Sequence, residues 1–291
     1  MRSSLLLPVL VLIVTTRIAA AQPAAAALVG GVVLYEVKAG DTVSSIGARF
    51  GVARATLIEL NQLSAPDALP IGRSLIIDNT HIAVGHPDVS VTINIAQRLL
   101  VYAEHEQVRA YPIAVGRRTW PTPVGAFTVV SKEIDPAWDV PLSIQREMER
   151  QGKPVITRME AGLDNPLGRH WIGLSLPGLG IHGTNAPSSV YAFASHGCIR
   201  MHPDDVAQLF ERVSVGNSGV LIYQPVIVAL IEGRVWIEAH PDEYRREPDA
   251  ARSVRDAIER EGLSSDVNWV LVDEVLRQRR GGAGDVTIAR W

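Results

Sequence analysis

Val89-Ser90-Val91-Thr92-Ile93-Asn94-Ile95 carries an apolar side chain at every second position. This period-two alternation predicts a β-strand with one face in a core. Further runs of strand-forming residues follow, separated by turn residues: Leu99–Tyr102, Ala110–Val115 and Phe127–Val130. Several short strands at this spacing predict a mainly β domain of the sandwich or barrel type, which we place at residues 88–223.

One helix is expected within this β domain. Pro203 is followed by Asp204 and Asp205. Proline is tolerated in the first turn of a helix, and acidic side chains there interact favourably with the helix dipole. The apolar residues that follow recur at helical spacing: Val206, Leu209, Phe210 and Val213.

Residues 34–78 predict a second, smaller α+β unit with the order strand, helix, helix, strand. Leu34–Val37 alternates like a short strand, and Ser74–Ile77 forms the last one. The helix boundaries rest on residues that typically cap or end helices: Asp41 or Thr42, Gly51, and Asn61.

The N-terminus has the pattern of a targeting segment. Arg2 precedes the apolar run Leu5–Val14, and Ala19-Ala20-Ala21 offers a small-residue cleavage site. This order is typical of a secretory signal peptide, which we assign to residues 1–21 with cleavage near Ala21. The run is too short to span a bilayer, and no later stretch has the length and apolarity to do so. We therefore expect an exported protein without an integral membrane span.

The remaining segments have weaker patterns. Alanine-rich residues 22–33 are expected to be a flexible leader, and residues 79–87 a linker. Residues 224–291 are expected to form a C-terminal extension with a hairpin and two helices. The expected hairpin strands, turn residue and helices of the extension are Ile227–Leu230, Arg234–Glu238, Gly233, Asp249–Glu261 and Ser265–Arg279.

Composition excludes several function classes. The 291 residues suggest about two domains. The net charge is −3, and aromatic residues make up only 5%. Nucleic-acid binding requires clustered basic residues, so it is not expected. The single cysteine, Cys198, excludes an internal disulfide framework and a four-cysteine metal site.

The chemically informative residues lie between His182 and Arg200. The sequence reads Ile181-His182-Gly183-Thr184 and, after ten residues, Ser195-His196-Gly197-Cys198-Ile199-Arg200-Met201. A thiol attacks only as thiolate, so a catalytic Cys198 needs a nearby base. A strand–loop–strand hairpin would place His182 beside Cys198 and form a nucleophile–base pair. The amides around Gly197 and Cys198 would then be expected to line an oxyanion hole.

The sequence also allows other roles for the cysteine. A lone cysteine is usually a buried, inert side chain. A metal site would combine His196 and Cys198 with His182 or His202, but the motif lacks a carboxylate to complete the usual ligand set. In papain-like peptidases the cysteine usually precedes its histidine; here His182 comes first, although His202 and His240 follow.

The segment around Cys198 resembles the signature of the YkuD-type L,D-transpeptidase catalytic domain, in its ErfK-like branch. Further similar segments are Thr119–Phe127, Pro136–Pro141, Asn165–Gly168, Leu174–Pro177 and Glu238–Pro241. Residues 34–78 resemble the LysM domain in Tyr35-x-Val37-x-x-Gly40-Asp41-Thr42-x-x-x-Ile46, Leu60-Asn61 and Gly72-x-x-Leu75. The resemblance implies a β-sandwich-like catalytic domain preceded by a small βααβ LysM domain that binds glycan strands.

The resemblance also implies roles for individual residues. Cys198 is the nucleophile. His182 is the general base, oriented through a backbone carbonyl near Gly183, whereas the residues alone do not rank His182 above His196. His196 and Gly197 shape the oxyanion hole with Cys198. The expected substrate-binding or bracing residues are Arg200, Gly183 and Ser195, of which Ser195 is more structural. Trp138 and Trp171 line the peptide groove or pack in the core.

The implied reaction is peptidoglycan cross-linking in the periplasm. Cys198 forms a thioester with a tetrapeptide stem, D-alanine leaves, and an amine accepts the acyl group. That amine is a second stem's diaminopimelate, giving a 3→3 cross-link, or a lysine of an outer-membrane lipoprotein. Water as acceptor would give an L,D-carboxypeptidase, and loss of catalysis a peptidoglycan-binding protein. No cofactor is expected, because thiol and imidazole supply all proton transfers.

Overall fold

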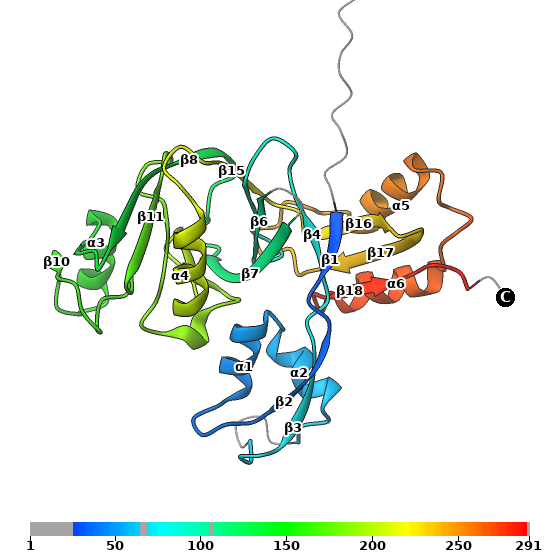
Figure 1. The fold of residues 1–291 in the computed structure, drawn as a ribbon, viewed down its shortest axis with the longest axis horizontal. Coiled ribbons are helices and arrows are strands. Elements are labelled where there is room, and N and C mark those ends of the chain that lie inside the picture. The colour runs from blue at the N-terminus through cyan, green and yellow to red at the C-terminus, as the bar shows by residue number, and fades with distance from the viewer. Residues whose placement is uncertain (1–25, 65–68, 105–106, 290–291) are drawn as a thin grey trace, which may run out of the picture.

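The fold was obtained as a computed structural model that describes residues 26–64, 69–104 and 107–289. Figure 1 shows a strand-rich body, a small unit beside it that contains α1 and α2, and a C-terminal unit with α5 and α6. In these three ranges no helix has the length and apolar character needed to cross a bilayer.

The strand-rich body contains a sheet that closes on itself. The ring of hydrogen-bonded strands runs β7, β14, β12, β11, β8, β15, β5 and β6, and β6 pairs again with β7. A ninth strand, β13, pairs with β7 outside the ring. The bounds are β5 (Val91–Asn94), β6 (Leu99–Glu104), β7 (Gln107–Gly116), β8 (Gly125–Ile134), β11 (His170–Leu174), β12 (Gly180–His182), β13 (Phe193–Ser195), β14 (Ile199–Met201) and β15 (Ser218–Ile222). The predicted mainly β class is confirmed.

The first predicted strand is more deeply buried than its alternation indicates. All four residues of β5 are buried, including the polar Thr92 and Asn94. Thr92 Oγ1 accepts a hydrogen bond from the His86 amide, and Asn94 bonds both backbone groups of Gln224. Their polar groups are thus paired inside the protein, which is the condition for burying them.

The predicted helix after the cysteine motif is α4 (Pro203–Arg212). Its Val206, Leu209 and Phe210 belong to the main hydrophobic core with strands of the ring. The predicted acidic first turn is present, and His202 caps the helix by accepting a hydrogen bond from the Asp204 amide. Because α4 follows β14 directly, it anchors the strand that carries the cysteine motif.

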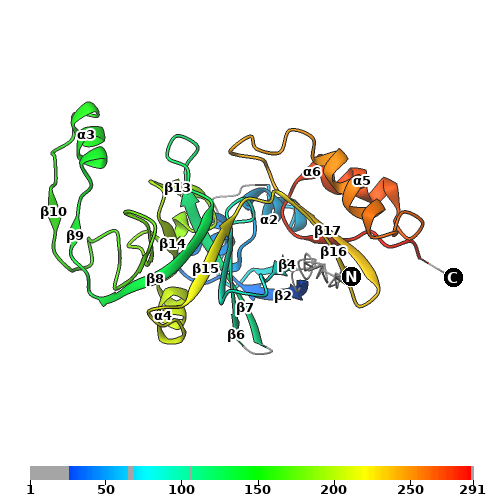
Figure 2. The same cartoon turned by 90° about the horizontal axis from the view of Figure 1, so that it is seen from above.

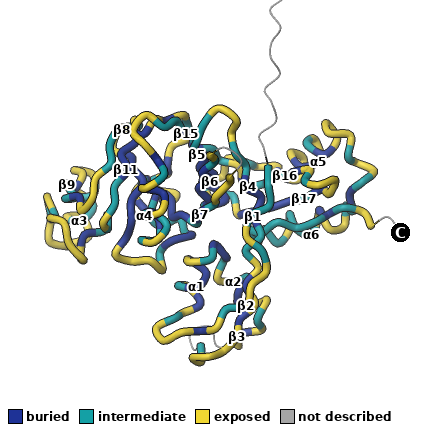
Figure 3. Tube along the Cα trace, in the orientation of Figure 1, coloured by how far each residue is buried: buried dark blue, intermediate teal, exposed yellow. Residues whose placement is uncertain are grey.

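The small unit has the predicted order of elements: β2 (Val32–Glu36), α1 (Val43–Phe50), α2 (Arg54–Leu60) and β3 (Ser74–Asp78). Thr42 is the N-cap of α1 and forms a capping box with Ser45. Gly51 ends the helix in the left-handed conformation, with φ 73°. Figure 3 shows that the helices are buried on the inside of this unit, while long parts of β2 and β3 stay exposed.

Two of the segments predicted to lack structure instead form a two-stranded sheet. β1 (Ala26–Val29) lies in the predicted leader and pairs antiparallel with β4 (His81–Val84), which lies in the predicted linker. Both predictions are wrong for these residues. The short apolar side chains of β1 pack with Ile82 and with Ile227 of the C-terminal unit. Sequence patterns miss such strands because distant partners stabilise them. The predicted signal peptide, residues 1–21, lies outside the described residues.

The C-terminal unit is a folded body with its own core. β16 (Val226–Ile231), β17 (Arg234–Ala239) and β18 (Ala283–Asp285) form a sheet that is covered by α5 (Ala250–Arg260) and α6 (Trp269–Gln278). The predicted hairpin and both helices are present. The second helix begins later than predicted, because Asn268 accepts hydrogen bonds from two amides and caps α6.

An arm leaves the ring between β8 and β11 and was not predicted. It consists of β9 (Trp138–Asp139), α3 (Leu142–Arg150) and β10 (Arg158–Met159). Figure 2 shows α3 at one extreme end of the molecule, beyond β9 and β10. The short helix η1 (Pro187–Ser189) lies between β12 and β13.

Candidate active site

The cysteine motif and the histidine motif lie on neighbouring strands of the ring. β12 and β14 pair in parallel, with Ile181 opposite Ile199 and His182 opposite Arg200. Ile181 and Ile199 are in the hydrophobic core. Because side chains alternate along strands, His182 and Arg200 face away from the core. The predicted hairpin is therefore wrong: the strands are parallel, and β13 and η1 lie in the connection between them.

His182 is held in one tautomer. Its Nδ1 lies 2.7 Å from the Gly183 carbonyl oxygen, so Nδ1 carries the proton and donates. Nε2 is then unprotonated and available as a base. The ring stacks on Trp171, with 6.0 Å between centroids. Burial and the Arg200 charge lower the pKa of His182 to about 4, which keeps the imidazole neutral at pH 7.

Cys198 directly precedes β14 and is partly exposed. Its thiol donates to the Gly178 carbonyl oxygen at 3.5 Å. Burial raises the pKa of the thiol, against opposing effects of the Gly180 backbone and the Arg200 charge. The lowered pKa of His182 and the raised pKa of the Cys198 thiol both favour the neutral forms, so a resting thiolate–imidazolium pair is not favoured. The base must instead remove the thiol proton during attack.

This resting state predicts slow alkylation of Cys198. We expect its rate with iodoacetamide to rise with pH to a midpoint above about 8.5, the ordinary thiol value, because only the thiolate reacts. Mass spectrometry of the intact protein over a pH series measures the rate. The chain unfolded in denaturant is the control and is expected to show the ordinary midpoint. A folded-state midpoint below pH 7 would show a stabilised thiolate.

The loop that carries the cysteine is fixed by side-chain hydrogen bonds. Gly197 has φ 115°, which a side chain would strain. Ser195 Oγ donates to the Cys198 carbonyl oxygen at 2.6 Å and accepts from the Gly197 amide at 3.1 Å. Thr122 Oγ1 donates to the Gly197 carbonyl oxygen at 2.7 Å and accepts from the Gly116 amide at 2.8 Å. Ser195 is buried, and both of these hydroxyl contacts lie within the loop.

One of the two amides predicted for the oxyanion hole is engaged. The Gly197 N–H points to Ser195 Oγ and serves the loop in this structure. That part of the prediction does not match the geometry. The Cys198 amide is the remaining candidate donor from the predicted pair.

His196 points into a polar cluster formed with the arm. Its Nε2 lies 2.6 Å from Glu147 Oε2, and Arg117 Nη2 lies 2.5 Å from Glu147 Oε1. The Trp120 ring meets the His196 ring edge-on at 5.0 Å. The hydrogen bond from His196 is the largest of the effects that lower the Glu147 pKa. This engagement of Nε2 supports a structural role for His196.

Arg200 braces the segment before the cysteine motif. Its Nη1 donates to Ser189 Oγ of η1 at 2.7 Å. Its Nε is buried and has no partner among the described residues. Gly183 supplies the carbonyl for His182 and approaches the Leu167 carbonyl so closely that an added Cβ would lie 3.3 Å from it. Of the two roles foreseen for Arg200, the contact with Ser189 supports bracing.

The sequence motifs did not reveal all residues of the site. Glu147 and Arg117 reach His196 from the arm and from beyond β7, and no local pattern marks them. Thr122 lies in the Thr119–Phe127 segment that resembles the family. That resemblance is the sequence signal that could have identified Thr122. No group of three or more potential metal-binding side chains occurs in the part of the chain that the structure describes.

A closed sheet thus carries His182 on β12 and the cysteine directly before the neighbouring strand β14. The family model of the YkuD L,D-transpeptidase catalytic domain matches residues 88–228, and that of the LysM domain matches residues 35–78. The chain belongs to the YkuD-type L,D-transpeptidase family and is an enzyme of that class.

Similar proteins include two bacterial relatives. The chain is 28% identical to the probable L,D-transpeptidase ErfK/SrfK of Salmonella typhimurium, over 90% of this chain and 89% of the relative. It is 32% identical to the putative L,D-transpeptidase YkuD of Bacillus licheniformis, over 63% of this chain and 95% of the relative. The solved L,D-transpeptidase from Mycobacterium smegmatis matches with a TM-score of 0.35 and 20% identity, over 69% of this chain and 99% of that chain.

Proposed function

We propose that this enzyme transfers tetrapeptide stems of peptidoglycan to an amine acceptor through a thioester on Cys198. The observation that carries the proposal is the arrangement of His182. Its Nδ1–H is fixed on the Gly183 carbonyl, and its neutral Nε2 is left for proton transfer on the strand next to Cys198.

In the first half-reaction, Cys198 Sγ attacks the carbonyl of the third stem residue. His182 Nε2 takes the thiol proton and passes it to the departing amine of the D-alanine. The carbon–nitrogen bond breaks and a thioester remains. Developing charge on the carbonyl oxygen is stabilised by the backbone N–H of Cys198.

In the second half-reaction, an amine attacks the thioester. His182 accepts a proton from the amine and returns it to the sulfur, so an amide forms and the thiol is restored. The acceptor is a second stem's diaminopimelate, which gives a 3→3 cross-link, or a lipoprotein lysine. Thiol and imidazole carry every proton, so the reaction requires no cofactor.

Each of the three units of the chain has a separate role in the proposed function. Residues 34–78 hold a glycan strand, residues 88–223 carry out acyl transfer, and residues 224–291 form the C-terminal extension. We place the reaction in the periplasm, after export directed by residues 1–21. The matched LysM model and the single free cysteine support this assignment.

The proposal is tested with the mature protein and a purified disaccharide-tetrapeptide. We expect intact-protein mass spectrometry to show an acyl adduct on Cys198, and product analysis to show released D-alanine and a 3→3 dimer. Tripeptide without dimer, even with a lipoprotein lysine peptide added, would identify an L,D-carboxypeptidase. The absence of both adduct and product would leave only a peptidoglycan-binding role.

A further inference from the structure

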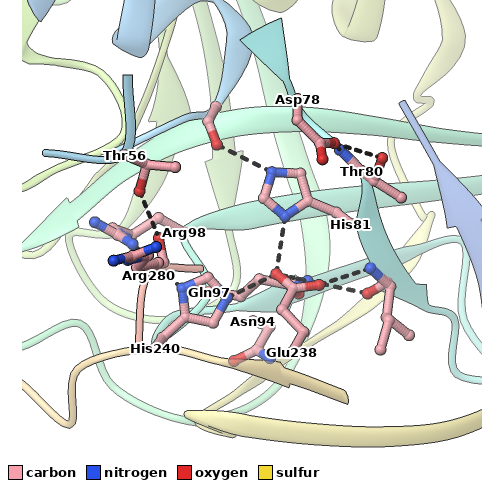
Figure 4. A network of polar contacts seen from close by, with 12 residues as sticks. Thr56, Asp78, Thr80, His81, Asn94, Gln97, Arg98, Glu238, His240 and Arg280 are labelled. Atoms are coloured by element: carbon pink, nitrogen blue, oxygen red, sulfur yellow. Dashed lines mark hydrogen bonds and ion pairs between the residues drawn. The ribbon is translucent and has the colours of Figure 1, made fainter. Parts of the chain in front are cut away.

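A buried carboxylate joins the C-terminal unit to the rest of the molecule. Glu238 on β17 is fully buried. Its carboxylate accepts hydrogen bonds from four groups: His81 Nδ1 at 2.8 Å, the Ile82 amide at 2.6 Å, Gln97 Nε2 at 3.0 Å and His240 Nε2 at 2.7 Å. These interactions outweigh burial and keep the Glu238 pKa well below its usual range. Figure 4 shows the side chains converging on this carboxylate.

His81 connects that carboxylate to the small unit of residues 34–78, here called the LysM unit. Its Nδ1 faces Glu238, and its Nε2 lies 3.0 Å from the Gly51 carbonyl oxygen at the end of α1. Both partners accept hydrogen bonds, so both ring nitrogens must be protonated and the imidazole is a cation. Accordingly, the His81 pKa is raised, because the attraction and hydrogen bond of Glu238 exceed the cost of burial and the repulsion from Arg98.

The contacts of Arg98 define the protonation state of His240, the second histidine at the Glu238 carboxylate. Arg98 Nη2 lies 3.3 Å from His240 Nδ1, so His240 accepts there and donates to Glu238 through Nε2. His240 is therefore neutral, in agreement with its lowered pKa. The Arg98 guanidinium also lies over the Tyr191 ring, 4.2 Å from the centroid. The cluster thus combines side chains from β4, from the C-terminal unit around β17, and from the strand-rich body that carries Cys198.

A second group of contacts links the same units near the surface. Arg280 forms an ion pair with Glu59 of α2, and its carbonyl oxygen accepts from Thr56 Oγ1 at 3.3 Å. The next residue, Gly281, has φ 65° and no room for a side chain: an added Cβ would lie 2.7 Å from the His240 ring. The C-terminal unit therefore touches both the LysM unit and the buried cluster.

The position of the LysM unit matters for the active site because α1 packs beside η1. Ser189 at the end of η1 accepts the hydrogen bond from Arg200, and Arg200 lies opposite His182 on the paired strand. One face of the LysM unit is thus next to a segment that frames the catalytic residues. Domains joined by small polar contacts usually move relative to one another. A buried ion pair resists such opening, because separation would leave a buried charge without its partner.

We propose that His81 and Glu238 are positioning residues that hold the LysM unit fixed relative to Cys198, so that stem peptides still attached to a glycan strand are favoured over free peptides. The C-terminal unit serves to supply Glu238 to this contact. The inference rests on the proposed function. Holding the glycan at a fixed place raises the effective concentration of its stem peptide at the thiol, whereas a loosely tethered LysM unit would raise it less.

The test compares the full mature chain with His81→Gln, which keeps one donor but removes the cation. We expect kcat/KM on polymeric, glycan-linked peptidoglycan to fall about tenfold, because effective concentration depends on geometry. Turnover of the soluble disaccharide-tetrapeptide should stay within about twofold, since acyl transfer itself is unchanged. Arg49→Gln is the matched control: it breaks the exposed ion pair between the LysM unit and Asp204 of α4, and should change neither value.

A distance measurement tests directly whether the LysM unit is held in a fixed position. Spin labels at Ser74→Cys and Val130→Cys, both exposed, are introduced with Cys198→Ala to leave only two thiols. We expect a narrow distance distribution that broadens with His81→Gln. Gly281→Ala crowds the His240 ring beside Glu238 without removing a buried charge, and should broaden the distribution if His81→Gln does not fold.

The outcomes separate the two proposals. Unchanged distances and unchanged polymer turnover in a folded variant would overturn the positioning role. An equal loss on polymer and soluble substrate would assign His81 to general stability instead. If the unmodified enzyme turned over neither substrate, the proposed function would fail, whereas the distance measurement would still judge the contact.

Discussion

Cys198→Ala is expected to abolish transpeptidation, lowering kcat by about 10⁴-fold or more, as removal of a catalytic nucleophile does in other enzymes. No other thiol of the chain can replace it, because Cys198 is the sole cysteine. D-Alanine release from a disaccharide-tetrapeptide measures the loss, and the acyl adduct should disappear from the intact-protein mass spectrum.

The same variant should leave glycan binding unchanged, since the LysM unit has a separate hydrophobic core. Co-sedimentation with insoluble peptidoglycan and the melting temperature are the controls. The melting temperature should stay within about 4 °C, because removing one partly exposed sulfur atom costs little stability. Full activity of Cys198→Ala would show that the nucleophile is another residue.

Local periodicity explains which parts of the fold could be predicted. β6 and α4 have continuous apolar patterns, so their side chains alone indicate their conformation. β1 does not: its two alanines carry no strand preference, and the strand exists because β4 and Ile227 cover it. The closure of the ring through β6 and β7 depends on long-range pairing, which no single segment encodes.

Local sequence patterns also explain which residues of the candidate site could be predicted and which could not. The sequence predicts His182 and Cys198 because short runs surround them: Gly183 follows His182, and His196 and Gly197 precede Cys198. Their parallel pairing was not found, because the ten residues between the motifs suggested a hairpin rather than a connection through η1 and β13. Glu147 could not be identified, since its carboxylate reaches His196 from an arm 49 residues away in sequence.

The hydrogen-bond partners of His182 and His196 favour one side of a choice that the residues alone left open. His182 and His196 flank the same motif, but their ring nitrogens have different partners. His182 Nδ1 donates to a backbone carbonyl, which leaves Nε2 without a proton, whereas His196 Nε2 lies 2.6 Å from Glu147 and 3.0 Å from Arg117. A free, neutral nitrogen is what a general base requires. We therefore expect His182 to act as the base and His196 to shape the loop.

His182→Gln is accordingly expected to lower kcat/KM by about 10²- to 10⁴-fold, the usual contribution of a general base. His196→Gln is the matched control: its amide can still donate to Glu147, so its loss should be below about tenfold, or about 1.4 kcal/mol. In the unmodified enzyme, kcat/KM should fall as pH drops through about 4, where His182 gains a proton and can no longer accept one. That acid limb should vanish in His182→Gln but persist in His196→Gln, and the opposite pattern would assign the base to His196.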